Sequence, residues 1–398
     1  MTENRPKKAI IVGGGIGGLA TAATLRKVGL EVEVWERARE LRAAGTALSF
    51  MCNAVAALHT LDIHIEDELA ARGRIFERLD FRTRKGRLIR TVDFTEFARR
   101  QDAPSFAVHR ADLQATLLGA AGSDLRIELG AVATGFRITD VGVQVDFTDG
   151  RQATGDLLIG ADGFNSAIRR QLIGTEEVRD GGYVCWLATV PFEHPKFVPG
   201  FAAHYWGAGE RFGLADIGNG HAYWWGTKNT APGQSASAGV KAEVERVFSG
   251  WAPEVLEVIR RTPAESIVTV RAQDRPFRDT WGKGPVTLLG DAAHPMLVSL
   301  GQGAAMAVED AAVLAQQLAA HPDVEQGLRG YEATRIPRTR IMVDASYALS
   351  QVEQLEGPVK HRMRALYFKF AREAKFAEQN ASVLLFPATE PAVLAPAG

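Results

Sequence analysis

The first forty residues show a regular change between apolar segments and turns. An apolar run over residues 9–12 predicts a strand, and apolar positions at helical spacing predict a helix from about Ile16 to Val28. A second apolar run, which ends at Glu36, predicts another strand. Strand, helix and strand in this order indicate a βαβ unit of an open α/β sheet.

The turn between the first strand and the helix has the GxGxxG spacing of a dinucleotide-binding fingerprint. Gly13 permits the tight turn, Gly15 lets a pyrophosphate approach the backbone, and Gly18 lets the helix pack closely on the strand. Glu36 stands where a carboxylate accepts hydrogen bonds from ribose hydroxyls. Such turns also occur as plain structural corners, but the complete unit favours dinucleotide binding, without separating FAD from NAD(P).

Two later apolar strands each deliver an aspartate to a loop. The segment GDLLIGADGFNSAIRR carries Asp162, and PVTLLGD ends at Asp291. Ligands of an open α/β sheet bind at the carboxyl ends of strands. Gly301 and Gly303 then lead into an alanine-rich helix, whose free amides and dipole would face a nearby anion. The alternative is that Asp291 only caps a turn and the helix fills the core.

Between about residues 181 and 272 the pattern changes to strands. The segments are GYVCWLATV, FAAHYWGAG, RFGLADIG, HAYWWGTKN and ESIVTVRAQ. Strand alternation must send some of their aromatic side chains to a core and some to the opposite face. A single aromatic ring in a strand is more often core than ligand wall, so we expect a ligand-binding face rather than one binding ring. The aromatic residues are Tyr183, Trp186, Tyr205, Trp206, Tyr223, Trp224 and Trp225.

Composition narrows the class of protein. The chain has 398 residues, 46% hydrophobic and 23% charged, which fits a globular enzyme of two or three units and excludes disorder. A formal charge of -1 gives no overall field that would attract nucleic acid. Cys52 and Cys185 form neither a CxxC motif nor a metal-ligand cluster, so we expect a cytoplasmic protein without a bound metal. We expect no membrane span, because Glu309 and Asp310 interrupt the alanine-rich helix and no other long uncharged apolar run occurs.

Taken together, the motifs resemble the FAD-dependent aromatic-ring monooxygenases of the para-hydroxybenzoate hydroxylase type, the group A flavoprotein monooxygenases. The resemblance covers about residues 7–345 and rests on Gly13–Gly18, Gly160–Arg169 and Gly290–Asp310 in that order. GYVCWLATV and YWWGTKNTAPG are most similar to the branch with urate hydroxylase-like and zeaxanthin epoxidase-like members. The resemblance implies an α/β fold. In this fold a Rossmann-type, glutathione reductase-like FAD domain is interleaved with a mostly antiparallel substrate sheet and followed by C-terminal helices.

The resemblance also implies a cofactor site. Arg110 would contact the flavin, and Gln114 lies one helical turn later on the same face. Asp162 would serve FAD and NAD(P)H, while Asp291 would accept from a ribityl hydroxyl. Because no second GxGxxG occurs, NAD(P)H would bind transiently over the same crevice. The full implied set is Gly13, Gly15, Gly18, Glu36, Arg37, Arg42, Arg110, Gln114, Asp162, Asp291, Gly301, Gly303 and Ala304.

The implied reaction is insertion of one atom of O2 into an aromatic or polyene-like small molecule by a flavin C4a-hydroperoxide, with NAD(P)H as reductant. Arg211 and Tyr223 are candidates to bind an acidic substrate and steer its phenolic or enolic oxygen, although a surface arginine and a core tyrosine are the alternative. His294 is a candidate for proton transfer, against a histidine with a structural hydrogen bond. Val298 stands where many family members have proline, which puts the usual active-site wall in doubt.

Segment boundaries follow from the same pattern. We expect the FAD domain over 1–75, 100–180 and 272–345, and the substrate sheet over 76–99 and 181–271. An amphipathic C-terminal helix is expected over 346–383, and a tail over 384–398. The chain would act as a monomer or a homodimer.

Other functions remain open at this stage. A flavin-dependent halogenase would need a WxWxIP segment, and a disulfide reductase would need paired cysteines; the sequence has neither. A FAD-binding protein of the same fold that does not oxygenate, or that only sequesters a ligand, is the main alternative, because a fold does not prove turnover.

Overall fold

The structure is a computed structural model that describes residues 7–41, 46–231, 239–371 and 373–386. Within these residues the strands form four sheets, and the first is a parallel sheet of five strands. In spatial order it contains β18 (Val286–Leu288), β12 (Leu157–Gly160), β1 (Lys8–Val12), β2 (Glu31–Trp35) and β8 (Arg126–Glu128). The helix α1 (Ile16–Lys27) connects β1 to β2, which confirms the predicted βαβ unit.

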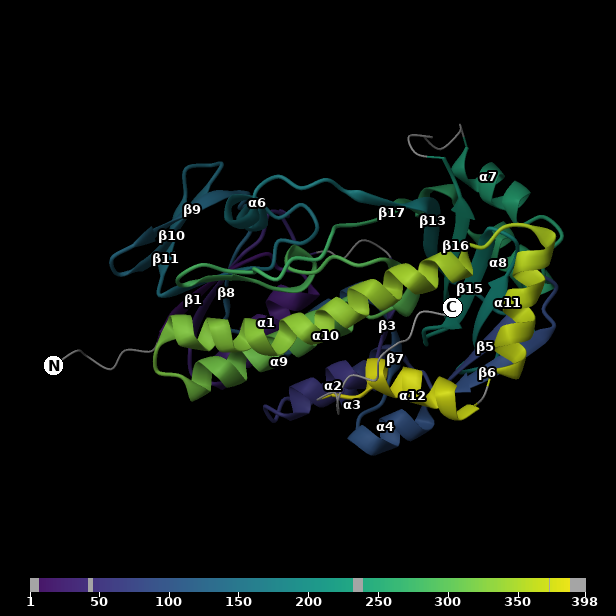
Figure 1. The fold of residues 1–398 in the computed structure, drawn as a ribbon, viewed down its shortest axis with the longest axis horizontal. Helices are drawn as coiled ribbons and strands as arrows, with labels where there is room; N and C mark the ends of the chain where they lie inside the picture. The colour runs from purple at the N-terminus through teal and green to yellow at the C-terminus, as the bar shows by residue number, and fades with distance from the viewer. Residues whose placement is uncertain (1–6, 42–45, 232–238, 372, 387–398) are drawn as a thin grey trace.

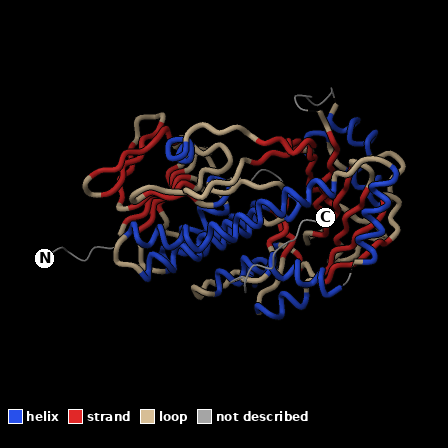
Figure 2. Tube along the Cα trace, viewed as in Figure 1, coloured by secondary structure: helices blue, strands red, loops and turns tan. Residues whose placement is uncertain are grey.

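The second large sheet has seven strands in the described residues (Figures 1 and 2). Its pairs are antiparallel except for one parallel pair between β14 and β5. In spatial order it contains β17 (Val268–Asp274), β13 (Arg179–Pro191), β16 (His221–Asn229), β15 (Glu210–Asp216), β14 (Ala202–Trp206), β5 (Arg78–Thr83) and β6 (Leu88–Asp93). All five strands predicted over 181–272 are therefore present, and β13 and β17 each extend slightly beyond the predicted segment.

Two smaller sheets complete the strands described. One contains β9 (Ala133–Thr139), β10 (Gly142–Phe147) and β11 (Gln152–Gly155), and the other β3 (Ala47–Phe50), β7 (Phe106–His109) and β4 (Arg74–Ile75). The shorter helices are α2 (Cys52–His59), α3 (Glu66–Arg72), α4 (Thr95–Gln101), α5 (Arg110–Ala121), α6 (Ala167–Ile173), α7 (Val240–Val247) and α8 (Pro253–Arg261). Three 3-10 turns are η1 (Ala264–Ser266), η2 (Gly290–Ala292) and η3 (Val298–Leu300).

The two faces of the seven-stranded sheet have different surroundings. Trp186, Tyr205 and Trp224 point to one face, where they form a core with Phe248 of the segment after α7 and Val255 of α8. Trp206, Tyr223 and Trp225 belong to the opposite face, which lines a cavity. Strand alternation thus divides the aromatic residues between core and cavity, as the sequence pattern predicts.

Four helices follow the last parallel strand. They are α9 (Gly303–Ala320), α10 (Val324–Glu353), α11 (Pro358–Phe370) and α12 (Glu373–Leu384). The segment 346–383, which we expected as one helix, therefore contains the end of α10 and two further helices, while 387–398 of the expected tail lie outside the described residues. Figure 1 shows α10 extending from the parallel sheet to the seven-stranded sheet. No helix in the described ranges is long and apolar enough to cross a membrane.

A buried charge network fixes α9 against α10. Arg335 of α10 donates to Glu309 at 2.6 Å and to Asp310 at 2.7 Å, both on α9. Asp310 also accepts from the amide of Gly290 at 3.1 Å and contacts Nε2 of His294 at 2.6 Å. Burial alone would raise the pKa of Asp310, but the charges of His294 and Arg335 outweigh it and lower this pKa to about 2. The network therefore holds the loop that follows β18 to the first half of α9.

The depressed pKa predicts a specific acid sensitivity. The stability that ionised Asp310 provides is complete above its ordinary pKa of 3.8 and is lost as the pH falls toward about 2. We expect wild type to lose about 2 kcal/mol more unfolding free energy than Asp310→Asn between about pH 5 and pH 2.5. Urea titrations of both proteins across this range measure the difference, and parallel pH curves would contradict it.

Candidate functional site

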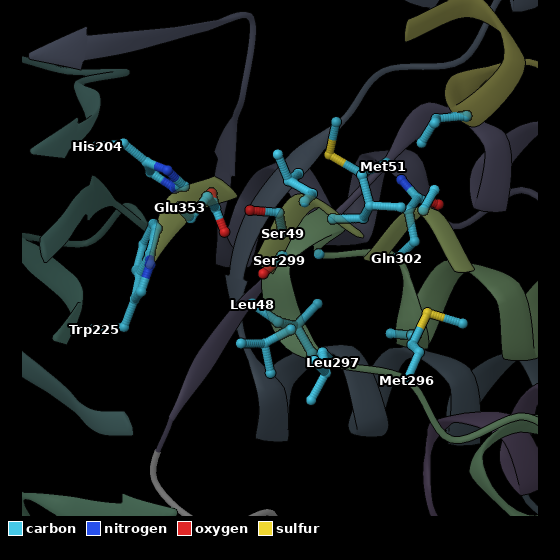
Figure 3. A pocket seen from close by; sticks show the side chains of 18 of the residues that line it. Leu48, Ser49, Met51, His204, Trp225, Met296, Leu297, Ser299, Gln302 and Glu353 are labelled. Carbon is cyan, nitrogen blue, oxygen red and sulfur yellow. The ribbon is translucent and has the colours of Figure 1, made fainter. Parts of the chain in front are cut away.

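A cavity of about 1880 Å³ lies between the loops of the parallel sheet and the aromatic face of the seven-stranded sheet (Figure 3). The loops contribute Gly15, Gly163, Gly290, Asp291 and residues 296–304. The sheet contributes Cys185, Leu187, His204, Trp206, Arg211, Tyr223 and Trp225, and α10 to α12 contribute Glu353, Met363, Arg364, Phe368, Val383 and Leu384. Ligand pockets for one drug-sized molecule measure roughly 300–1,000 Å³, so this cavity has room for more than one.

The glycine turn is held in place by side chains that the sequence singled out. Glu36 accepts from the amide of Gly14 at 2.6 Å and from that of Ala38 at 2.8 Å. The amide of Gln114 donates to the carbonyl of Gly14 at 2.8 Å. Glu36, directly after β2, and Gln114 of α5 therefore both hold the turn at Gly14, one through its amide and the other through its carbonyl.

The glycines of the turn divide into two kinds. A Cβ on Gly13 would lie 2.2 Å from the carbonyl oxygen of Ala161, and one on Gly18 would lie 1.8 Å from that of Gly13. A Cβ on Gly15, Gly163 or Gly301 would meet no protein atom within 4 Å. The first two glycines are required by the protein's own packing, whereas the other three border open space, which leaves room for the pyrophosphate and ring system of FAD.

The loop before α9 forms one wall of the cavity. Asp291 is exposed in this wall, and its Oδ1 lies 4.0 Å from the position of a Cβ on Gly303. Gly301 has a φ of +63°, which favours glycine, and it precedes the start of α9. The buried Gln302 has no partner for its Nε2 among the described residues. This wall therefore presents an acceptor carboxylate and the donor amides of a helix start, a combination that fits the ribityl chain and the polar edge of a flavin.

The other expected cofactor residues take different positions. Arg110 begins α5, is exposed and lines the cavity. Asp162 turns toward α6, where its Oδ2 accepts from the amide of Ala167 at 2.7 Å, while its Oδ1 is buried without a partner among the described residues. Burial raises the pKa of Asp162. Arg37 is exposed after β2, and Arg42 lies outside the described residues.

Aromatic rings cover the sheet side of the cavity. The ring of Trp225 lies across Gly213 of the neighbouring strand, so closely that a Cβ at Gly213 would lie 2.0 Å from the ring. Its ring centroid is 5.2 Å from that of Tyr223 and 4.9 Å from that of His204. Burial raises the pKa of Tyr223, so the phenol stays protonated, and burial followed by the charge of Arg211 lowers the pKa of His204 to about 3. Both groups are neutral at physiological pH.

Arg211 is buried in the cavity wall and is not a surface residue. It pairs with Glu353 at the end of α10, and its Nη2 lies 3.4 Å from the hydroxyl of Ser299. Figure 3 shows Glu353 on the same side of the pocket as His204 and Trp225, with Ser299 between this side and Gln302. The cavity thus brings together residues from β14, β15, β16, η3 and α10.

His294 is placed differently from Arg211 and Tyr223. It is buried, it does not line the cavity, and its Nε2 contacts Asp310 in the charge network. The position of His294 therefore supports a structural hydrogen bond with Asp310, and its side chain is not part of the cavity lining.

The fold and the cavity define a flavoprotein, in which the glycine turn and the loop before α9 would hold FAD beside the aromatic face of the seven-stranded sheet. When bound, FAD supplies the electron transfer and oxygen chemistry, and the protein positions the reactants. The profile of the FAD binding domain family matches residues 7–346, and the chain belongs to this family.

Individual relatives agree with this assignment. Aurachin C monooxygenase/isomerase of Stigmatella aurantiaca is 36% identical over 348 residues, which cover 87% of this chain and 90% of the relative. The structure of Klebsiella pneumoniae HpxO complexed with FAD and uric acid has a TM-score of 0.87 at 29% identity, covering 94% of this chain and 95% of that chain. Zeaxanthin epoxidase of Nicotiana plumbaginifolia is 32% identical over 84% of this chain, which spans only 53% of that longer protein.

These matches confirm the predicted family, its branch and its FAD cofactor, with NAD(P)H as the reductant typical of the family. The protein is a FAD-dependent monooxygenase. The sequence motifs did not predict that His204, Ser299 and Glu353 line the cavity. Their positions follow from strand pairing and helix packing over long sequence distances, and no local motif marks them.

The two kinds of glycine predict opposite effects of alanine. Gly18→Ala must displace backbone, so we expect a loss of about 3 kcal/mol in unfolding free energy, even without cofactor. Gly15→Ala has space in the protein and should cost less than about 1 kcal/mol without cofactor. It should nevertheless weaken FAD affinity by about ten-fold or more. Denaturant unfolding of cofactor-free protein and FAD titration measure both effects, and a cofactor-free Gly15→Ala as unstable as Gly18→Ala would refute the distinction.

Proposed function

We propose that this monooxygenase oxidises an aromatic or polyene-like small molecule held between the 296–304 wall and the Tyr223–Trp225 face. The observation that supports this most is the continuity of one cavity from the glycine turn to the aromatic sheet face. A molecule on the sheet face would lie beside the flavin ring, as oxygen transfer requires. Uric acid, bound in one neighbour, and 3-amino-4-hydroxybenzoate, named in one relative, are ring compounds, which supports a ring-containing substrate.

Part of the cavity suits a larger apolar group. We call this part the apolar chamber; it is lined by Phe76, Leu79, Phe81, Val92, Phe94, Trp206 and Phe368. The ring centroids of Phe81, Trp206 and Phe368 lie 4.7–5.0 Å apart. His204 connects the chamber to Trp225, because its ring contacts both Phe81 and Trp225. The chamber would bury an apolar substituent while the reacting ring stays near Tyr223.

Individual residues receive roles in this proposal. Tyr223, which is protonated and lines the cavity, would donate its hydrogen bond to an oxygen of the substrate. Arg211, which lies in the cavity wall, would bind the polar end of the substrate. The loop amides after Gly301 would stabilise negative charge on reduced flavin, and the apolar lining would exclude water from the reacting centre. NAD(P)H would bind transiently over the same crevice.

The proposal extends to the setting of the enzyme. Cys52 and Cys185 are both buried and unbonded, which is in keeping with a reducing, cytoplasmic compartment. We expect the protein to act as a monomer or homodimer with O2 as co-substrate.

Isotope labelling tests the reaction directly. Purified FAD-loaded enzyme is incubated with NADPH or NADH, 18O2 and a panel of phenols, quinolones and polyenes. We expect at least one compound to stimulate NAD(P)H oxidation and to gain one 18O atom. If no compound stimulates oxidation or gains the label, the alternative of a FAD protein that does not oxygenate is favoured.

Val298 provides a second test, because it lines the cavity with 56% of its surface exposed. Leu297 before it has φ -66° and ψ 156°, a conformation that a residue before proline adopts. Val298→Pro should therefore fit, and it should change the fraction of NADPH coupled to product several-fold. FAD affinity should change less than about two-fold, because the wall residues that would hold FAD keep their positions. Comparable losses in coupling and FAD affinity would contradict this.

A further inference from the structure

The polar end of the cavity contains an ion pair. Arg211 of β15 and Glu353 at the end of α10 are each 2% exposed and contact each other directly. Both side chains also line the cavity. Nε of Arg211 is buried without a partner among the described residues, Nη2 has a contact of 3.4 Å with the Ser299 hydroxyl, and the pair occupies only Oε2 of Glu353. A ligand in the cavity therefore meets a guanidinium and a carboxylate side by side, rather than a single positive charge.

Neighbouring cationic groups do not restore a free positive charge at this end. Arg364 donates to the carbonyls of Val352 and Glu353 at 3.3 and 2.5 Å and to that of Gly207 at 2.7 Å. Its charge thus faces the C-terminal carbonyls of α10, where the helix dipole is negative. His204 is neutral, and Arg271 is paired with Asp180 at 2.7 Å.

Four further charged residues of the described ranges line the cavity. Arg110 begins α5 beside the expected flavin, and Asp291 belongs to the loop before α9. Asp344 and Lys360 line the cavity from α10 and α11. Arg211 differs from these groups in that it forms a direct ion pair with Glu353, and this pair sets the charge that a ligand meets at this end.

We propose that Glu353 is a specificity-determining residue, which neutralises Arg211 and makes the cavity select a neutral aromatic head group over an aromatic anion. The inference rests on the proposed function, because it concerns the substrate of the same cavity. The matching head group carries a hydrogen-bond donor next to an acceptor, as an amide or lactam does, so that Glu353 accepts and Arg211 donates. A carboxylate in this place would lie against the carboxylate of Glu353 in a medium of low dielectric, which is unfavourable.

Equilibrium binding tests this proposal without turnover. FAD-loaded wild type is titrated with 4-hydroxybenzamide and with 4-hydroxybenzoate, and binding is followed by calorimetry and by the flavin absorption spectrum. Wild type should bind 4-hydroxybenzamide at least about ten-fold more tightly than 4-hydroxybenzoate. Glu353→Gln, which leaves Arg211 charged and unpaired, should shift the ratio of the two affinities toward the carboxylate by about ten-fold or more.

Matched variants separate charge from folding. Glu356→Gln removes an exposed carboxylate just after α10 that is not part of the lining, and it should keep the wild-type ratio. Arg211→Gln/Glu353→Gln removes both charges and should lose the gain in carboxylate affinity shown by Glu353→Gln. Thermal unfolding and FAD content confirm that each variant is folded. If Glu353→Gln does not fold, Glu353→Met removes the same charge and takes its place. The ratio of amide to carboxylate affinity in wild type tests the proposal in either case.

Two results would overturn the proposal. One is a wild type that binds the carboxylate at least as tightly as the amide. The other is a folded Glu353→Gln with an unchanged ratio. Failure of every compound to take up 18O, with the expected binding ratios intact, would instead count only against the proposed oxygenation.

Discussion

The position of Arg335 between Glu309 and Asp310 is the contact on which the cofactor wall depends. Arg335 joins α10 to α9, and Asp310 in turn holds Gly290 and His294. Glu309 also accepts from Arg338 and from Asn53. Burial of so many charges is tolerated because every carboxylate is paired and hydrogen-bonded. The network thereby fixes the start of the loop at Gly290 and His294, and this loop continues to Gly301, where the chain would meet the flavin.

The same helix that carries Arg335 also carries Glu353. Eighteen residues of α-helix separate the two, which corresponds to about 27 Å along the axis. One continuous helix, which contains Pro337, therefore contacts the cofactor wall through Arg335 and places the charge of Glu353 in the ligand cavity. The seven-stranded sheet contributes the facing aromatic wall, and α7 and α8 support that sheet from behind. Fold and specificity are thus linked through packing rather than through the motifs alone.

The sequence predicted those parts that depend on short-range patterns. The βαβ unit, the start of α9 at Gly303 and all five strands over 181–272 follow from spacing, glycine positions and alternation. Family resemblance added FAD, which the fingerprint alone could not distinguish from NAD(P).

Contacts between distant segments could not be predicted in this way. The parallel pairing of β5 with β14 joins residues more than a hundred positions apart, and the partners of Arg211 and His294 lie on other elements. Arg211 illustrates the limit: its residue type indicated an anion-binding role or a surface position, but the structure buries it against Glu353. The character of this end of the cavity follows from that pairing.

A crystal structure of the FAD-loaded protein with 4-hydroxybenzamide would test the account most directly. We expect the flavin ring against the 301–304 segment and the ligand ring between it and the Tyr223–Trp225 face, with the amide at Arg211 and Glu353. A flavin ring outside this cavity, or a ligand bound away from the aromatic face, would contradict the account.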